Sequence, residues 1–442
     1  MTRLLATLTL CVVVAAPLAA QDTTQGEKGV RVGIDVNRGV RPGVIVLPVA
    51  SGLDSVRAIV QRDLDYSDRF EMIGATDIAS GTPTGGRATE GELQSGINYG
   101  LYRSFGASYG VQIVSAPGGV TVRLHDIRAG KVRNQQNFVL ASGEGEAFRM
   151  SVHQVGDEVT RWISGTPGIA ATQVLFVGGD KRIYRIDSDG WGATPITPAG
   201  EPAFSPAWSP DGRRFAYTRL DRGEIIVRDL GGGGAVTVPG TESGVNYTAA
   251  FSPDGRHVAF AHSDEQGTNI VSADVAARCC VQRLTVGRFA DNLSPTYSPD
   301  GRRIAFVSTR AGPPQVYFMD ADGADQQLLV PFDYGTTGAS YSPEWAPDGT
   351  SVAFHRDVGG TFQVLVMDVA SRRVRQVTSS GRNEDPTWAP DGRHLAFISD
   401  RTGRRQLWVL DLETGRVRQL GTSSVARIPS WSRRLGGAVS NP

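Results

Sequence analysis

A turn-forming tetrapeptide recurs five times in the chain, and its spacing is the strongest constraint on the fold. It ends in Pro-Asp-Gly and lies between an aromatic residue and an apolar segment, as in "YSPDGRRIAF" from Tyr297. Its successive aspartates, separated by 43, 46, 48 and 43 residues, are Asp211, Asp254, Asp300, Asp348 and Asp391. A repeat of this length is typical of one β-propeller blade.

Each repeat is predicted to form four strands. A short strand ends in the aromatic residue, and the tetrapeptide then turns the chain into a segment such as "RRIAF". Segments such as "QVYFMD" and "VRQL" supply the third and fourth strands. In the second strand Ile304 and Phe306 face one side and Ala305 faces the other, so both faces are apolar. This pattern predicts a sheet packed between two neighbouring sheets, as in radial blades.

The two ends of the repeat region complete each other. Residues 173–198 contain the last three strands of a repeat, and residues 428–435, "IPSWSRRL", contain only a first strand. Five continuous blades and one composite blade therefore predict a six-bladed ring closed by the C-terminal strand. An open repeat array is the alternative, and the complementary end fragments argue against it.

The region before the repeats predicts a mixed α/β domain at residues 39–165. It contains a buried-type strand in "GVIVLPV", helical spacing at 52–70, a hairpin at 120–140 and an amphipathic helix ending near the "GTPG" junction. A Gly, Thr and Ser-rich stretch at 79–92 predicts a loop. The six-bladed propeller is then expected at 166–435, with a short tail at 436–442.

Residues 1–20 have the pattern of a secretory signal peptide: a basic start, an apolar run and small residues. An uncleaved anchor is the alternative, although the run is short for a bilayer span. We therefore expect export and no membrane insertion of the mature chain. The formal charge balances, with 45 basic and 45 acidic residues, so no long-range basic field for nucleic acid is evident.

The repeated aspartate is explained by a type I turn, in which Pro presets φ and Gly accepts a positive φ. "DADGAD" at 320–325 and "DSDG" at 187–190 resemble the start of a calcium loop, but Pro331 occupies the place of the required glutamate. His257 and His394 occupy matching repeat positions and are interpreted as outward polar residues. We expect no metal and no cofactor.

The sequence contains no H-E-x-x-H metalloprotease motif, and the chain is predicted not to be an enzyme. Cys279 and Cys280 are adjacent and can bridge only through a strained ring, and their redox state is left open. An exported propeller hydrolase or lyase, or a propeller that binds glycans or peptides, remains the alternative.

One rim of the ring is expected to bind a partner protein. The turns on one face are nearly identical, whereas the loops on the other face differ from repeat to repeat. Tyr247, Asn292, Glu384 and Arg427 bring aromatic, polar and charged groups to that rim, a chemistry suited to protein binding. Unconstrained solvent loops are the alternative interpretation.

The chain resembles the TolB family of periplasmic propeller proteins of the Tol-Pal system. The resemblance rests on the signal peptide, on "VRVGIDVNRGVRPGVIVLPV" and "VTVRLHDIRAGKV" in the α/β domain, on "GTPG" followed by "QVLFV", and on "PTWAPDGRHLAF". It covers nearly the whole chain. The repeat is shared by many exported propellers, so the α/β domain placed before the ring makes the match specific.

The resemblance implies a periplasmic, non-enzymatic, monomeric protein. It would link the outer-membrane lipoprotein Pal to the inner-membrane TolQ-TolR-TolA complex and support membrane integrity and invagination during division. Pal would dock at the channel mouth, where Asn246 and Leu293 join Tyr247 and Asn292. A flexible segment at 21–38, whose matching residues are Arg31, Ile34 and Asp35, would engage TolA. The polar extension "QDTTQGEKG" departs from the family at this segment.

Overall fold

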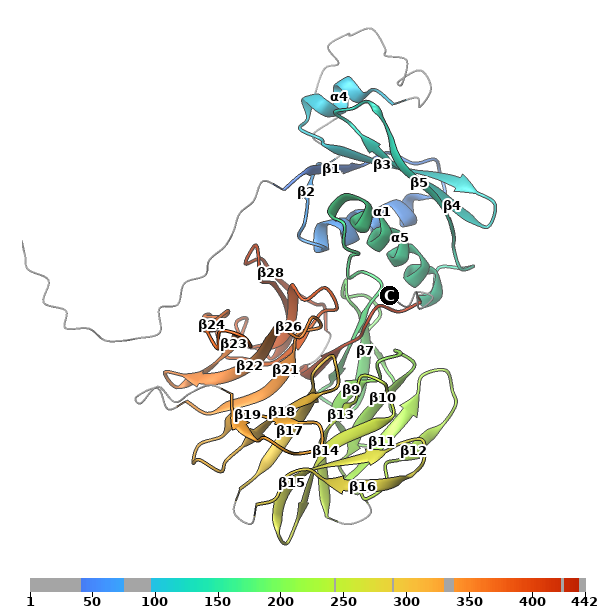
Figure 1. Cartoon of the computed structure of the whole chain (residues 1–442). Coiled ribbons are helices and arrows are strands. Elements are labelled where there is room, and N and C mark those ends of the chain that lie inside the picture. Colours follow the sequence, from blue (N-terminus) through green and yellow to red (C-terminus); the bar gives the residue numbers. More distant parts are fainter. Residues whose placement is uncertain are drawn as a thin grey trace, which may run out of the picture. The chain divides into compact units, whose positions relative to one another are not determined.

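The computed structural model describes residues 41–74, 97–241, 244–287, 290–329, 338–422 and 425–436, all within the unit Ile34–Pro442 (Figure 1). The predicted signal peptide, the segment 21–38 and the loop at 79–92 lie outside the described residues. Within the described part, no helix is both long enough and apolar enough to cross a lipid bilayer.

The α/β domain is a five-stranded sheet with the strand order β2-β1-β3-β4-β5. Its strands are β1 (Gly43–Val46), β2 (Glu71–Met72), β3 (Tyr109–Ala116), β4 (Gly119–Asp126) and β5 (Lys131–Val139). The helices α1 (Asp54–Tyr66) and α5 (Glu146–Ser164) pack on one face, where Val60 and Val155 share a core with Val111. The helix α4 (Tyr99–Ser104) covers the other face through Tyr99. The predicted helices, strand and hairpin are all present.

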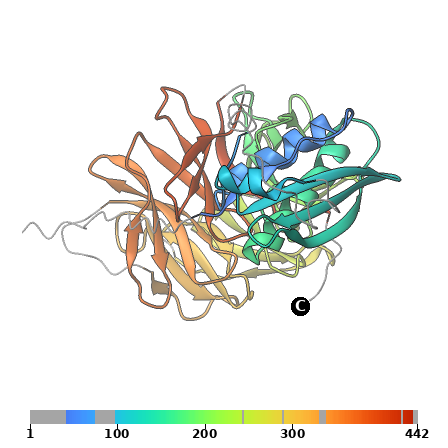
Figure 2. The ribbon, with the colours of Figure 1, turned by 90° about the horizontal axis from the view of Figure 1, so that it is seen from above.

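Six four-stranded antiparallel sheets form the propeller, and they follow one another in chain order (Figure 2). The inner strands are β9 (Ala203–Trp208), β13 (Val245–Phe251), β17 (Asn292–Tyr297), β21 (Ser340–Trp345), β25 (Asn383–Trp388) and β29 (Arg427–Trp431). The second strands are β10 (Arg214–Arg219), β14 (His257–Asp264), β18 (Arg303–Ser308), β22 (Ser351–Val358), β26 (His394–Ser399) and β6 (Gln173–Val177). The third strands are β11 (Glu224–Asp229), β15 (Gly267–Asp274), β19 (Gln315–Asp320), β23 (Thr361–Asp368), β27 (Gln406–Asp411) and β7 (Ile183–Asp187). The outer strands are β12 (Ala235–Thr237), β16 (Cys279–Arg283), β20 (Gln327–Leu328), β24 (Val374–Gln376), β28 (Val417–Gln419) and β8 (Thr194–Pro195).

The last strand of the propeller closes the ring. Strand β29 pairs antiparallel with β6, with Trp431 opposite Val174. The Trp431 indole donates a hydrogen bond to the Thr172 hydroxyl at 2.8 Å, and the Ser432 amide donates to the Gln173 carbonyl at 2.9 Å. The predicted composite blade and the predicted six-bladed ring are confirmed.

Both faces of a blade are buried against neighbouring blades. Ile304 and Phe306 share a core with Ala259 of the preceding blade, whereas Ala305 packs in a different core with Phe354 of the following blade. The alternation of large and small side chains therefore has the predicted cause.

The repeated tetrapeptide forms the predicted local turn. The Gly301 amide donates to the Ser298 carbonyl at 2.9 Å, and Gly301 has a φ of 72°. The Asp300 carboxylate accepts from the Arg302 amide at 3.1 Å and from the Ser298 hydroxyl at 2.6 Å. Asp300 is thus used within the hairpin, as a turn aspartate should be.

Candidate functional site

The inner strands of all six blades share one six-residue pattern, which builds the channel of the propeller. Its first residue is completely buried in every blade; these residues are Ala203, Asn246, Asn292, Ser340, Asn383 and Ala426. Its sixth residue is aromatic in every blade; these residues are Trp208, Phe251, Tyr297, Trp345, Trp388 and Trp431.

The third residue of the pattern has a left-handed backbone in all six blades, although none is glycine. Their φ values lie between 45° and 51°, and they are Ser205, Thr248, Ser294, Ser342, Asp385 and Ile428. In each blade the register with the second strand shifts across this residue, as in a β-bulge. Backbone strain of this kind costs about 1–3 kcal/mol per residue and clusters at functional sites.

These six residues line a cavity of about 600 Å³ at the rim formed by the variable loops. The second residue of the pattern gives this rim its chemical variety; the six are Phe204, Tyr247, Leu293, Tyr341, Glu384 and Arg427. Phe204, Tyr341, Glu384 and Arg427 line the cavity. We call this cavity and its lining residues the rim cavity.

One wall of the rim cavity is aromatic. The rings of Tyr341 and His355 are stacked with centroids 5.6 Å apart, and Phe362 meets both of them edge-on. The Asp385 amide donates to Nδ1 of His355 at 3.1 Å, so this nitrogen carries no proton. Burial lowers the pKa of His355. The wall is therefore uncharged at neutral pH and suits an apolar side chain of a partner.

The neighbouring wall is charged. The Glu384 carboxylate accepts from Arg382 at 2.7 Å and from Arg405 at 3.0 Å. The Asp385 carboxylate accepts from the Ser342 hydroxyl at 2.8 Å. Arg427 is exposed at the same rim. This mixture of aromatic and charged groups fits a protein-binding surface better than a site for a small apolar ligand.

Two predicted partner-binding residues are buried and form hydrogen bonds within the blades instead of facing outward. Asn246 is completely buried and donates to the Gly223 carbonyl at 2.7 Å. Asn292 is also completely buried, donates to the Thr268 carbonyl at 3.1 Å and accepts from Arg310 at 3.0 Å. The expectation that these amides face a partner needs correction, because their hydrogen-bonding groups are used inside the blade.

The other predicted residues divide between the cavity and the blades. Glu384 and Arg427 line the rim cavity. Tyr247 and Leu293 are partly buried and pack against the core between their two blades. Arg31, Ile34 and Asp35 lie outside the described residues. The sequence analysis did not identify Tyr341, His355 and Phe362 as residues of the cavity. Tyr341 holds the same position of the repeat as Tyr247 and Leu293, and this equivalence was a usable signal.

A partly buried carboxyl, that of Glu344, is among the residues shared by the rim cavity and a second cavity at the face of the repeated turns. The second cavity also has a volume of about 600 Å³. The carboxyl accepts from the Trp388 amide and from the Thr387 hydroxyl, each at 3.0 Å, across the blade boundary. Burial outweighs these hydrogen bonds and raises the pKa of Glu344 to about 7.

The turn face of the last continuous blade contacts the α/β domain through charged groups. His394 is completely buried, which corrects its interpretation as an outward polar residue. Its Nδ1 lies 2.8 Å from Asp391, and its Nε2 lies 3.3 Å from Asp68, just after α1. Arg416 contacts the Asp68 carboxylate at 3.0 Å. Arginine and imidazole thus supply the positive charge that a metal ion would supply elsewhere.

A second acidic cluster contacts α5. Asp187 and Asp189 belong to the "DSDG" hairpin, and their carboxylates face Arg149, which approaches Asp189 at 2.5 Å. His153 of α5 lies 2.9 Å from Asp63 and 3.9 Å from Asp187. Both clusters bring carboxylates and histidine together, but the arginines make them ion-pair networks. They hold the turn face against α1 and α5.

The sequence of the propeller is similar to that of known proteins. Residues 161–433 match a family described as the TolB beta propeller domain. Tol-Pal system protein TolB of Alcanivorax borkumensis is 29% identical over 223 residues, which are 47% of this chain and 48% of that protein. The protein of the same name from Methylococcus capsulatus is 30% identical over 216 residues, 45% of this chain and 49% of that protein. The matched region thus spans about half the length of these relatives.

The fold as a whole also has a solved counterpart. The crystal structure of TolB from Acinetobacter baumannii superposes with a TM-score of 0.73, covering 89% of this chain and 97% of that one. The sequence identity over this superposition is 24%. At this identity the similarity shows that the two chains share the α/β domain and the propeller, and it shows the fold alone.

Proposed function

The chain belongs to the TolB beta propeller family, and from this premise we propose that it is a non-enzymatic periplasmic component of the Tol-Pal system. It links a Pal-like outer-membrane lipoprotein, bound at the rim cavity, to a TolA-like protein of the inner-membrane complex, bound by residues 21–38. In this role it supports outer-membrane integrity and invagination during division, and it acts as a monomer.

The observation that carries this proposal is that the backbone of the rim cavity repeats from blade to blade, whereas its side chains do not. Six blades repeat one strained bulge at the third position of the inner strand. The second position carries different chemistry in each blade, from Phe204 to Glu384 to Arg427. A repeated frame with non-repeated side chains suits a single asymmetric protein partner, because each part of the rim can contact a different part of it.

The cavity offers little that supports the alternative of a hydrolase or lyase. Its three described carboxyl groups have partners: Glu384 pairs with Arg382 and Arg405, Asp385 accepts from Ser342, and Glu344 accepts from the Trp388 amide and the Thr387 hydroxyl. Nδ1 of His355 already accepts a hydrogen bond from the Asp385 amide, so it has no lone pair left to accept a proton from a substrate. A general base needs access to a reacting proton in a plausible substrate pose. These contacts favour binding over turnover.

Crosslinking tests the proposal. The mature protein is mixed with the soluble domain of the Pal-like lipoprotein of the same organism, and crosslinked peptides are mapped by mass spectrometry. We expect crosslinks on the inner strands and loops of the rim cavity. A chain lacking residues 21–38 should keep them and lose capture of the TolA-like protein. Crosslinks confined to the turn face, or turnover of a peptide or glycan library, would contradict the proposal.

A further inference from the structure

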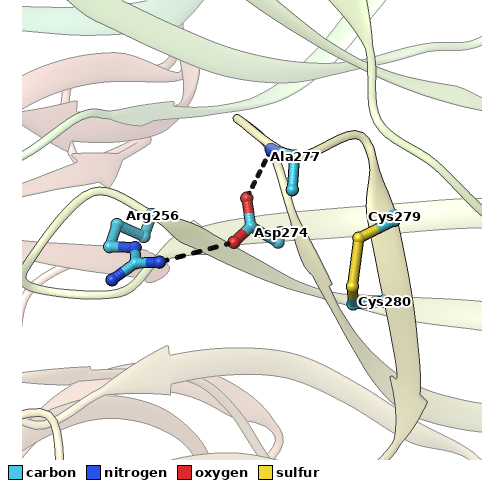
Figure 3. The surroundings of a disulfide bond; sticks show 5 residues. All are labelled: Arg256, Asp274, Ala277, Cys279 and Cys280. Carbon is cyan, nitrogen blue, oxygen red and sulfur yellow. Dashed lines mark hydrogen bonds and ion pairs between the residues drawn. A yellow bond between two sulfur atoms is a disulfide. The ribbon is translucent and has the colours of Figure 1, made fainter.

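An outer strand of the propeller carries a disulfide between adjacent residues. Cys279 and Cys280 are bonded at the start of β16, with Cα atoms 3.8 Å apart (Figure 3). Cys280 is exposed and Cys279 is partly buried. The preceding turn is fixed by Asp274, which accepts from the Ala277 amide at 2.8 Å and lies 4.0 Å from Arg256. The pair thus lies at an accessible edge, directly after an ordered turn.

This bond does not work as a structural staple. A disulfide stabilises mainly by restricting the unfolded chain, and the effect grows with the length of the loop that it closes. Here the sequence separation is 1, so no loop is closed. Strand β16 is held instead by its ladder with β15, where Val271 pairs with Arg283 and Ser272 pairs with Gln282. We therefore expect the propeller to keep its structure without this bond.

The surroundings of the pair also differ from those of a metal site. Within the described part of the chain, the clusters of acidic, histidine and cysteine side chains that could hold an ion include neither cysteine. The nearby charges have both signs. Asp274 is the ladder partner of Cys279, and Arg278, which precedes the pair directly, is exposed and forms no ion pair with another described residue. Partial exposure and a neighbouring arginine are features of reactive cysteines.

We propose that Cys279 and Cys280 form a redox site that exchanges with dithiols, whether of small molecules or of protein. A thiolate of the dithiol attacks Sγ of Cys280, and Sγ of Cys279 leaves as a thiolate and takes up a proton. The second thiolate of the dithiol then attacks its own sulfur in the mixed disulfide, and Cys280 leaves and is protonated. The dithiol is oxidised to a disulfide, and the pair gains two electrons.

The two sulfurs have different roles in this exchange. Cys280 is attacked because it is exposed, and we assign to Arg278, the residue before Cys279 in the chain, the positive charge that favours the leaving thiolate. Reduction opens only the connection between two neighbouring residues. We therefore expect it to leave the secondary structure and the unfolding temperature of the propeller unchanged.

The test uses the full mature chain, purified without reductant and equilibrated in a series of reduced and oxidised dithiothreitol buffers. Acid quenching, alkylation and peptide mass spectrometry then report the redox state of the pair. We expect a reversible two-electron transition under native conditions, with an unchanged circular dichroism spectrum. The proposal is overturned if the bond opens only after denaturation, if both thiols are already free before reduction, or if reduction unfolds the propeller.

Single variants test the assignment of the two sulfurs. In Cys279→Ser the remaining Cys280 thiol should react with Ellman's reagent on the order of tenfold faster than the Cys279 thiol in Cys280→Ser. Equal rates, or a faster Cys279, would overturn the assignment. Arg278→Gln is the matched variant for charge. It should slow the reaction of the wild-type pair with the dithiol, and an unchanged rate would contradict the role given to Arg278.

Discussion

Nε2 of His394, in the last continuous propeller repeat, lies 3.3 Å from the carboxylate of Asp68, which follows the first helix of the α/β domain. The other ring nitrogen lies 2.8 Å from Asp391, the turn aspartate of its own repeat. Burial alone would lower the pKa of His394, but the charge and hydrogen bond of Asp391, the hydrogen bond of Asp68 and the charge of Asp411 raise it to about 9. The buried imidazole is therefore charged at neutral pH and joins the two domains.

The first prediction concerns the pH dependence of this contact. Because the folded pKa of His394 is above its ordinary value of 6.5, its stabilising contribution is complete below about pH 6.5 and is lost as the pH rises through about 9. His394→Gln should lower the free energy of unfolding at pH 6 by on the order of 3 kcal/mol and reduce its fall toward pH 9. Urea unfolding at a series of pH values measures both effects.

His257→Gln is the matched control, since His257 occupies the same repeat position and is partly exposed. This variant should follow the wild-type curve. If the two variants behave alike, the buried ion pair does not contribute as described.

The second prediction concerns Glu344, which is shared by the two cavities. Its folded pKa of about 7 is above the ordinary 4.5, so the stability linked to it is present below about pH 4.5 and is lost as the pH rises through about 7. Glu344→Gln keeps an oxygen for the Trp388 amide and the Thr387 hydroxyl but has no charge to bury. At pH 8 it should be more stable than wild type by up to about 3 kcal/mol. A variant that is less stable than wild type at both pH 6 and pH 8 would contradict this account.

The third prediction concerns the ring of bulges. Ile428 has a φ of 45°, which a β-branched side chain rarely adopts. Asparagine tolerates this conformation, so Ile428→Asn should be at least as stable as wild type, with a gain of up to about 1 kcal/mol. Ile428→Val keeps the branching and serves as the control, and it should show no gain. Thermal unfolding compares the three proteins, and a clear loss of stability in Ile428→Asn alone would show that the bulge is not strained.

Much of the fold was predictable because the repeat carries its information locally. The turn around Asp300, the alternation of Ile304 with Ala305, and the complementary fragments ending at Trp431 each follow from a few neighbouring residues. Together they predict the blade, its packing and the closure of the ring. The helices and the hairpin of the α/β domain were likewise visible as periodic patterns.

The details of the site were less predictable because they depend on the register of the inner strand. Asn246 and Tyr247 are adjacent in sequence, yet the first is completely buried and the second only partly so. Loop variability alone cannot tell these positions apart. Aligning the six inner strands on their aromatic residues would have separated them. The role of His394 was hidden for another reason, since its partner Asp68 lies in the other domain.

The central claim is that the rim cavity, rather than the turn face, binds the Pal-like lipoprotein. Arg427 is exposed at the rim and Arg302 is exposed at a repeated turn, so Arg427→Ala and Arg302→Ala remove the same group from opposite faces. Calorimetric titration with the soluble domain of the Pal-like lipoprotein should show affinity on the order of tenfold lower for Arg427→Ala, and wild-type affinity for Arg302→Ala. Equal affinities for both variants, or a loss confined to Arg302→Ala, would contradict the claim.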